Sequence, residues 1–572
     1  MSSQPCGFDF FNAAMIPANC YFFKLPAELK LAVISYLDQK RDLYNISKTS
    51  KWLEDIALKR LYKVVDIQIP AEKSSAWSTG GYLRLRKHVL KAIQEVTIRD
   101  GVMDHTQPQY SRRRRSDAGC PETYAMQVVE EIPQSQLKSF SFMHRSPISS
   151  RLVTLLNAKH GRSLRNLSYY AMATTILPTT TLPSSLESLE CRSIEDGKTL
   201  GELVYASKDT LKALNIGEEK ALVERYHRLR TAIYDVVPQP LHAFHTVVSL
   251  AQIRNLKKLG LVGLDLGPLV PQDVESALYL TNLEELVVES CVSSSEFFMA
   301  MTTIFTFAKS EAAPDPKPIP QLRRFLFRHE ISTAAIKEAI VQFLNSFHGL
   351  QMLSLLFENG SMSLRLADIA TNHSKTLKQL VLETRIQPRE SLRIDTSRPF
   401  GLGGYTQQLW EEGTDDICRL CSNLNELSVG FPWNDEMIRI RESPLPKLLN
   451  LQTMHIRNFP ESNTLLQMGD YTIREHATKF LDWTFGNVVG GSMPRLETLS
   501  IGPSVYESRF RGSDPSRKQI PEFLRTHHFM VDWAQTRFGR WSAMVTNVSE
   551  KYMEEMRGEK PMGGIFQQVW LK

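Results

Sequence analysis

One six-residue pattern recurs along most of this chain and limits what it can fold into. The pattern is L-x-x-L-x-L with conservative replacements, as in "LKKLGL" at residue 256 and "LEELVV" at residue 283. Thirteen copies begin at residues 93, 137, 164, 186, 211, 256, 283, 322, 350, 377, 424, 451 and 496. Seven of the twelve intervals between them are 22 to 28 residues long, and this regularity indicates a repeat.

The physics of a strand explains the pattern. Side chains alternate along a strand, so Leu259 and Leu261 are expected to point into a core, whereas Lys258, Gly260 and Val262 point outward. One unit cannot bury its leucine face alone and must stack on the next. The sequence therefore predicts an α/β fold, a curved parallel sheet backed by helices such as "AAIKEAIVQFLNSF" at 334–347.

These repeats resemble those of leucine-rich-repeat proteins of the irregular, helix-backed type, over roughly residues 90–503. The chain departs from the family pattern because it lacks the regular Asn or Cys after the strand and holds long inserts at 217–250, 384–416 and 457–493. The resemblance implies a solenoid whose concave wall binds another protein.

The stretch "LPAELKLAVISYL" opens a different kind of unit near the N-terminus. Pro26 stands where a first-turn proline is tolerated, and three short helices are expected to follow. Their apolar residues are Leu29, Val33 and Leu37 in the first, Leu43 and Ile46 in the second, and Trp52, Leu53, Ile56 and Leu61 in the third. About forty residues cannot cover this much apolar surface by themselves, so a partner is expected.

This stretch resembles the F-box from about Lys24 to Tyr62, in its Leu-Pro opening, its apolar core, its Asp42-Leu43 pair and the "SKW" before the last helix. The resemblance implies binding to a Skp-type adaptor and, through it, to a cullin-based ubiquitin ligase. The adaptor contacts it implies are Leu25, Pro26, Glu28, Leu29, Val33, Ile34, Leu37, Asp42, Leu43, Ile46 and Trp52.

A second interpretation of the same residues is an N-terminal cap for the solenoid. Exposure distinguishes the two: a cap would bury Pro26, Val33 and Leu37 against the repeats, whereas a docking module leaves them open. The expected organisation is a tail at 1–22, the F-box at 23–65, a linker and repeat cap at 66–135 with a basic loop near 100–122, repeats at 136–503 and a helical C-terminal cap at 504–572.

Outward positions on the sheet are candidates for holding a target protein. They include Tyr170, Arg192, Glu285, Glu289, Arg324, Arg328, His455 and Arg457. Arg and Tyr are frequent binding hot spots, so Tyr170, Arg324, Arg328 and Arg457 are the first choices, with Arg192 and His455 next. Arg324 and Arg328 flank Leu326 on one strand and predict a basic stripe suited to an acidic or phosphorylated segment.

Other features of the sequence are expected to be structural. "CRLC" at 418–421 lacks a second cysteine pair for zinc and is expected to hold buried thiols. "SRRRRS" at 111–116 is expected to form a solvated loop, and "FGLGG" at 400–404 is expected to form a turn. Serine-hydrolase, zinc-protease and nucleotide-binding motifs are missing, so a non-catalytic protein without metal or cofactor is expected.

Composition limits the compartment and the partners. A net charge of +6 on 572 residues is too dilute to indicate nucleic-acid binding, and no apolar run approaches the roughly 20 residues that span a bilayer. Seven cysteines are an odd number that fits a reducing compartment, so a cytoplasmic or nuclear protein is expected.

The sequence therefore favours a substrate receptor of a cullin-based ubiquitin ligase, with the F-box on the adaptor and the repeats on an unknown protein target. One alternative is an F-box protein in a non-proteolytic Skp-containing assembly, which would bind the adaptor without causing turnover of a partner. Another is a plain interaction scaffold or an undetected enzyme, and neither of these would bind the adaptor.

Overall fold

The structure is a computed structural model of the 572-residue chain. The residues that it describes are 21–37, 39–49, 51–69, 87–100, 121–144, 147–171, 182–194, 197–218, 244, 249–271, 273–310, 319–329, 333–358, 366–385, 415–431, 445–457, 470–486, 493–502, 526–549 and 552–553. The basic segment at 111–116, the glycine-rich segment at 400–404 and most of the predicted inserts at 217–250 and 384–416 lie outside them, whereas the insert at 457–493 is described over 470–486.

One continuous sheet runs through the described residues, with its strands hydrogen-bonded in chain order. Neighbouring strands are parallel from β1 to β14, and β15 and β16 are antiparallel additions. The strands are β1 (Val64–Ile69), β2 (Glu95–Asp100), β3 (Ser139–Met143), β4 (Asn166–Ala171), β5 (Ser188–Ser193), β6 (Ala213–Gly217), β7 (Lys258–Val262), β8 (Glu285–Glu289), β9 (Arg324–His329), β10 (Met352–Glu358), β11 (Gln379–Arg385), β12 (Glu426–Val429), β13 (Thr453–Ile456), β14 (Thr498–Ile501), β15 (His527–Gln535) and β16 (Trp541–Val548).

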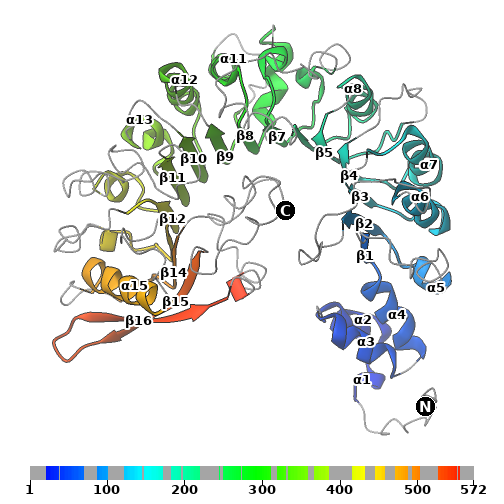
Figure 1. The fold of residues 1–572 in the computed structure, drawn as a ribbon, viewed down its shortest axis with the longest axis horizontal. Helices are drawn as coiled ribbons and strands as arrows, with labels where there is room; N and C mark the ends of the chain where they lie inside the picture. Colours follow the sequence, from blue (N-terminus) through cyan, green and yellow to red (C-terminus); the bar gives the residue numbers. More distant parts are fainter. Residues whose placement is uncertain are drawn as a thin grey trace, which may run out of the picture.

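Helices back the sheet on its convex side, so the chain forms an open arc with the strands on the inner wall (Figure 1). The helices of the arc are α5 (Lys87–Leu90), α6 (Pro121–Glu131), α7 (Ser150–His160), α8 (Gly197–Ala206), α11 (Ser294–Lys309), α12 (Ala334–Asn345), α13 (Leu366–Ala370) and α15 (Asp470–Thr484). Four more precede β1 as a separate bundle, which are α1 (Tyr21–Lys24), α2 (Ala27–Ser35), α3 (Lys40–Ser47) and α4 (Lys51–Leu61).

The predicted repeat accounts for the core. In each of the thirteen hexamers, the first, fourth and sixth residues are buried and belong to one continuous apolar cluster. Leu256, Leu259 and Leu261 are one such set, and Leu283, Leu286 and Val288 of the next hexamer pack beside them. Each fully buried apolar side chain stabilises the fold by about 1.5–3 kcal/mol, and this burial holds successive turns together. The expectation of a parallel sheet backed by helices is confirmed.

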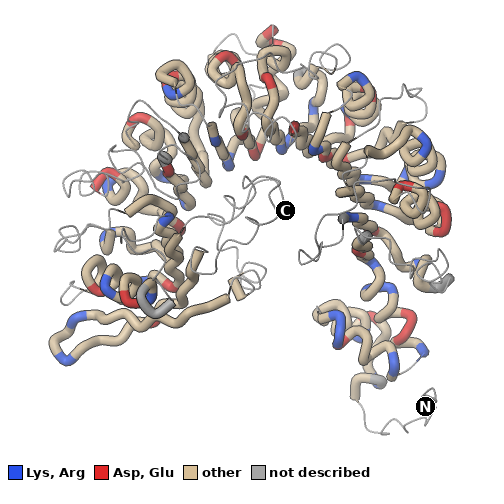
Figure 2. Tube along the Cα trace, viewed as in Figure 1, with Lys and Arg blue, Asp and Glu red and all other residues tan. Residues whose placement is uncertain are grey.

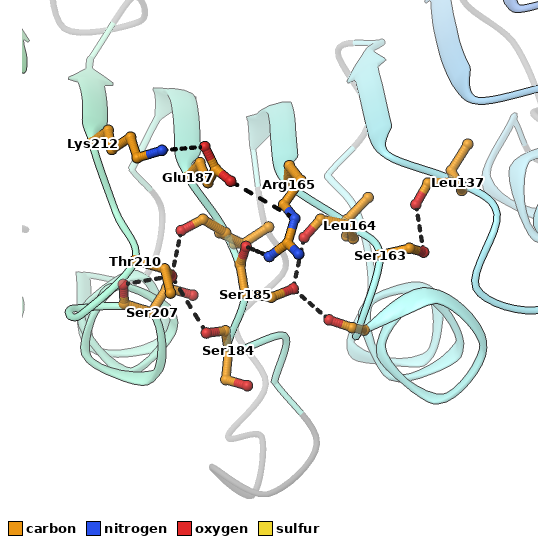
Figure 3. Close-up of polar contacts among 12 residues, drawn as sticks. Leu137, Ser163, Leu164, Arg165, Ser184, Ser185, Glu187, Ser207, Thr210 and Lys212 are labelled. Atoms are coloured by element: carbon orange, nitrogen blue, oxygen red, sulfur yellow. Dashed lines mark hydrogen bonds and ion pairs between the residues drawn. The ribbon is translucent and has the colours of Figure 1, made fainter.

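A ladder of polar side chains supplements this core. The residue before a hexamer's first leucine reaches back to a backbone carbonyl of the preceding repeat (Figure 3). The hydroxyls of Ser163, Ser185 and Thr210 donate to the carbonyls of Leu137, Leu164 and Leu186 at 2.8, 2.8 and 2.7 Å. Each bond satisfies a carbonyl that the turn leaves without a ladder partner, which fixes the spacing between repeats.

Asparagine performs the same task with a longer reach. The side-chain amide nitrogens of Asn255 and Asn423 donate to the backbone carbonyls of Asp209 and Lys375 at 2.6 and 2.8 Å. Each carbonyl lies two residues before the first leucine of the preceding hexamer. The family pattern places an Asn or Cys after the strand, whereas in this chain the polar residue that bonds to the preceding repeat comes before the strand.

Two predicted boundaries differ in the structure. The sheet begins at β1, before residue 66, because β1 and β2 pair in parallel register and their apolar residues join the core. The segment 504–572 was expected to be a helical cap, but β15 and β16 form a hairpin there. The His and Trp residues of this segment occur at helical spacing, which is why a helix was expected. However, Phe529, Val531 and Trp533 recur at every second position, as in a strand with one buried face. A strand here also pairs with the edge of β14, whose backbone groups a helix would leave without hydrogen-bond partners.

Candidate functional site

The N-terminal bundle has its own small core. Ile34, Leu43 and Leu53, one from each of α2, α3 and α4, are buried together in a cluster separate from that of the solenoid. A guanidinium nitrogen of Arg60 on α4 donates to the carbonyl of Ile34 at 2.6 Å and closes the end of α2. The bundle is therefore held together by its own contacts and does not depend on burying its outer faces against the repeats.

The outer face of α2 is apolar and exposed. Leu29, Val33 and Tyr36 follow helical spacing along it, with 51%, 44% and 84% of their surface accessible. Pro26 is exposed at its start, and Leu31 extends the apolar surface around the helix. Exposed apolar side chains that follow one face of a helix are typical of interaction surfaces.

The bundle also carries exposed aromatic side chains beside basic ones. Trp52 on α4 is exposed, and the ammonium of Lys30 lies 5.2 Å from its ring centroid. Lys48 lies 4.0 Å from the ring centroid of the exposed Tyr44 on α3. These lysines cover ring faces without burying them, so the surface offers aromatic groups and positive charge together.

The structure sorts the predicted adaptor contacts into three groups. Pro26, Glu28, Leu29, Val33 and Trp52 are exposed, and Leu25, Leu37, Asp42 and Ile46 are partly buried. Ile34 and Leu43 are fully enclosed in the bundle core, which places them out of reach of a second protein. Their contribution in this structure is to support the helix that carries the exposed residues.

Four further exposed residues of the same bundle were not among the predicted contacts, namely Tyr21, Leu31, Tyr36 and Tyr44. A signal for Leu31 was present, because "AELKLAVIS" is apolar around most of its circumference and only Ile34 of α2 is buried. Tyr21, Tyr36 and Tyr44 lie outside that segment. A helix that is apolar on more faces than its neighbours can cover leaves the surplus exposed.

The concave wall is the second place where binding residues were predicted. On its charged rows, acidic and basic residues of adjacent strands face each other. Glu285 on β8 lies between Lys258 on β7, at 3.5 Å, and Arg324 on β9, at 3.6 Å. Beyond the intervening row of Val287 and Leu326, Arg328 faces Glu289 at 3.7 Å.

These ion pairs compensate the positive charge of the predicted basic stripe. Arg324 and Arg328 do share one face of β9 with Leu326 between them. Each arginine is matched by a glutamate of β8, so the wall at this point carries compensating charges, and a target would have to compete with the glutamates.

Three of the six predicted target contacts are buried within the chain. Arg328 is one, and Arg457 is another, ion-paired with Glu383 of β11 and hydrogen-bonded to the hydroxyl of Ser428 at 3.3 Å. The imidazole of His455 is buried as well and lies 2.7 Å from the carbonyl of Gly502. These groups face partners of their own chain.

The other three predicted contacts are partly accessible. Tyr170 lies on the concave side of β4, and Arg192 on β5 pairs with Glu190 at 2.9 Å. Arg324 retains about a third of its side-chain surface. The accessible part of the wall that carries candidate residues therefore lies on β4, β5 and β9.

The cysteine pair of "CRLC" is held in apolar surroundings. Burial raises the pKa of both Cys418 and Cys421 to about 12, so both thiols are protonated at neutral pH. Zinc binds the thiolate, which these surroundings disfavour. Across the described ranges, no three His, Cys, Asp or Glu side chains gather as a metal site would require. None of the helices in those ranges is long and apolar enough to cross a bilayer.

Similarity to known proteins was found in the structure and not in the sequence. No protein-family model matches it, and no curated protein matches its sequence. The solved structures that align with it include two of leucine-rich-repeat proteins. The TLR13–ssRNA13 complex has a TM-score of 0.30 and 12% identity, covering 65% of this chain and 41% of that chain.

The second is the ectodomain of the receptor kinase GASSHO1/SCHENGEN3 from Arabidopsis thaliana, in complex with CASPARIAN STRIP INTEGRITY FACTOR 2. It has a TM-score of 0.24 and 10% identity, covering 70% of this chain and 45% of that chain. This chain thus spans less than half the length of either match. Similarities this low carry no information about a partner, and the solenoid is described from its own strand register.

Proposed function

We propose that the N-terminal bundle docks on a Skp-type adaptor, so that the chain serves as a substrate receptor of a cullin-based ubiquitin ligase. The observation that carries the proposal is the exposed apolar face of α2, formed by Pro26, Leu29, Val33 and Tyr36, on a bundle that has a separate core. A solenoid cap would bury this face against the repeats, and α2 does not do so.

The arc supplies the second half of the proposal. Its inner wall presents partly accessible polar and aromatic groups on β4, β5 and β9, at a distance from α2 along a stiff scaffold (Figure 1). A receptor of this kind contributes to ubiquitin transfer by raising the local concentration of a target lysine near the conjugating enzyme. None of its own side chains has to take part in the chemistry.

The test is a pull-down of the full chain with a purified Skp-type adaptor. Leu29→Ala combined with Val33→Ala should weaken binding at least tenfold, since interfaces depend on a few central apolar anchors. The matched control is Ile319→Ala combined with Leu449→Ala, which trims two aliphatic residues of the solenoid that are more exposed than Leu29 and Val33 and should leave binding unchanged.

Circular dichroism of both variants checks that the fold is retained. The adaptor-docking proposal is wrong if the wild-type chain does not bind the adaptor, or if the α2 variant binds as tightly as the control. Reconstituted ubiquitination of a bound target then separates a ligase receptor from a non-proteolytic Skp assembly, because only the receptor makes transfer depend on the cullin.

A further inference from the structure

The far end of the arc carries a rigid hairpin whose tip is not used by the proposed function. β15 and β16 pair in antiparallel register as far as Gln535 opposite Trp541. Within the turn, the amide of Thr536 donates to the carbonyl of Arg540 at 2.7 Å, and the amide of Arg540 donates back to the Thr536 hydroxyl at 3.2 Å. Gly539 has φ +73°, a conformation that favours glycine and fixes the turn.

This turn presents one large apolar side chain between two positive charges. Phe538 is 70% exposed, and the guanidinium of Arg537 lies 4.7 Å from its ring centroid. Arg540 is exposed as well, and within the described part of the chain neither arginine has an acidic partner. The hairpin reaches past α15 with basic residues at its turn (Figure 2).

We infer that this tip, Thr536 to Arg540, is a docking element for a folded protein that offers an apolar pocket rimmed by carboxylates. Phe538 is the anchor that such a pocket would enclose, and Arg537 and Arg540 would meet the rim through charge-assisted hydrogen bonds. An aromatic residue flanked by arginines is the composition of a binding hot spot. The closed turn lowers the entropy lost on binding, because the tip is already ordered.

Two other classes of macromolecule fit the tip less well. A nucleic-acid base would stack on the face of Phe538, but the guanidinium of Arg537 already covers one face. A lipid surface would gain from one apolar side chain in a five-residue turn and from two arginines worth about 1 kcal/mol each, which gives only marginal attachment.

The tip is separate from the adaptor surface. The hairpin ends the sheet at β16, and the bundle of α2, α3 and α4 precedes its first strand, so the two surfaces lie at opposite ends of the arc (Figure 1). Failure of either proposal therefore leaves the other standing, and variants of one surface serve as controls for the other.

The experiment places a photo-crosslinking amino acid at the hairpin tip of the full chain, expressed in cells of the organism that naturally makes it. Phe538→p-benzoylphenylalanine should form an ultraviolet-dependent adduct with one protein, at a peptide bordering an apolar, carboxylate-lined pocket. With that protein purified, Phe538→Ala should weaken binding at least thirtyfold. Arg537→Glu combined with Arg540→Glu should weaken it at least as much, and wild-type binding should weaken as salt rises.

Met544→Ala removes another exposed apolar side chain of the same hairpin and should leave binding unchanged, as should the α2 variant of the adaptor test. Four results would overturn the inference. They are the absence of an ultraviolet-dependent adduct, an adduct on a surface without carboxylates, equal binding by Phe538→Ala and wild type, or tip-dependent binding to phosphatidylserine vesicles or single-stranded RNA in place of a protein.

Discussion

His373 links two repeats in the middle of the arc, and its protonation should limit the stability of the fold in acid. Its imidazole Nε2 donates to the carbonyl of Leu344 at 2.9 Å, and its Nδ1 accepts from the amide of Leu350 at 3.3 Å. A ring that both donates and accepts must be neutral. Burial lowers the pKa of His373 from 6.5 to about 4, opposed only in part by its hydrogen bond to Leu344.

The sign of the effect follows from this shift. Below pH 6.5 the unfolded chain takes up a proton at His373 that the folded chain refuses until about pH 4. The stabilisation is therefore complete above pH 6.5 and is lost as the pH falls toward 4. With these two pKa values, the free energy of unfolding at pH 5.0 is lower than at pH 7.5 by about 2 kcal/mol through this residue alone.

His373→Gln retains a donor and an acceptor but cannot titrate, so its loss of stability between pH 7.5 and 5.0 should be smaller by about 2 kcal/mol than that of wild type. Urea unfolding at the two pH values measures the total, and amide exchange of β10 and β11 reports the local part, because a solenoid can open in segments. His160, whose pKa burial also lowers to about 4, contributes equally to both proteins and cancels.

Thr371→Ser is the control, since Thr371 is exposed on the same turn as His373 and the change removes no titratable group, so this variant should keep the full wild-type pH dependence. If His373→Gln lost as much stability in acid as wild type and the control, the assignment of His373 as a buried neutral bridge would be refuted.

Two further predictions concern the contacts between repeats. Thr210→Val keeps the shape of the side chain but removes the hydroxyl that donates to the Leu186 carbonyl, so urea unfolding should show a free energy of unfolding lower by about 1–2 kcal/mol. A loss of stability no greater than that of an exposed Thr→Val change elsewhere would contradict the proposed role of this ladder. Arg457→Met leaves Glu383 buried without its cation and should cost about 3–5 kcal/mol, whereas adding Glu383→Leu should restore most of it in the same assay. Equal stability of the single and double variants would show that the pair is not coupled.

The sequence by itself determined the repeating core. Leucine at the first, fourth and sixth positions of each hexamer combines the two-residue period of a strand with a face that only a neighbouring copy can bury, so the stacking direction follows from local pattern. The same reasoning anticipated three N-terminal helices, because their apolar residues recur at helical spacing, and it expected these helices together to have more apolar surface than they can cover.

Only the tertiary structure decided which outward residues are accessible. Arg324, Arg328 and Arg457 have the same chemistry in the sequence, but the side chain opposite each one comes from another strand, 39 residues away for Arg328 and Glu289 and 74 for Arg457 and Glu383. Strand register sets those pairings, and no local pattern encodes it. The C-terminal hairpin has the same origin, since the unpaired edge of β14 favours a strand where residue spacing alone also allowed a helix.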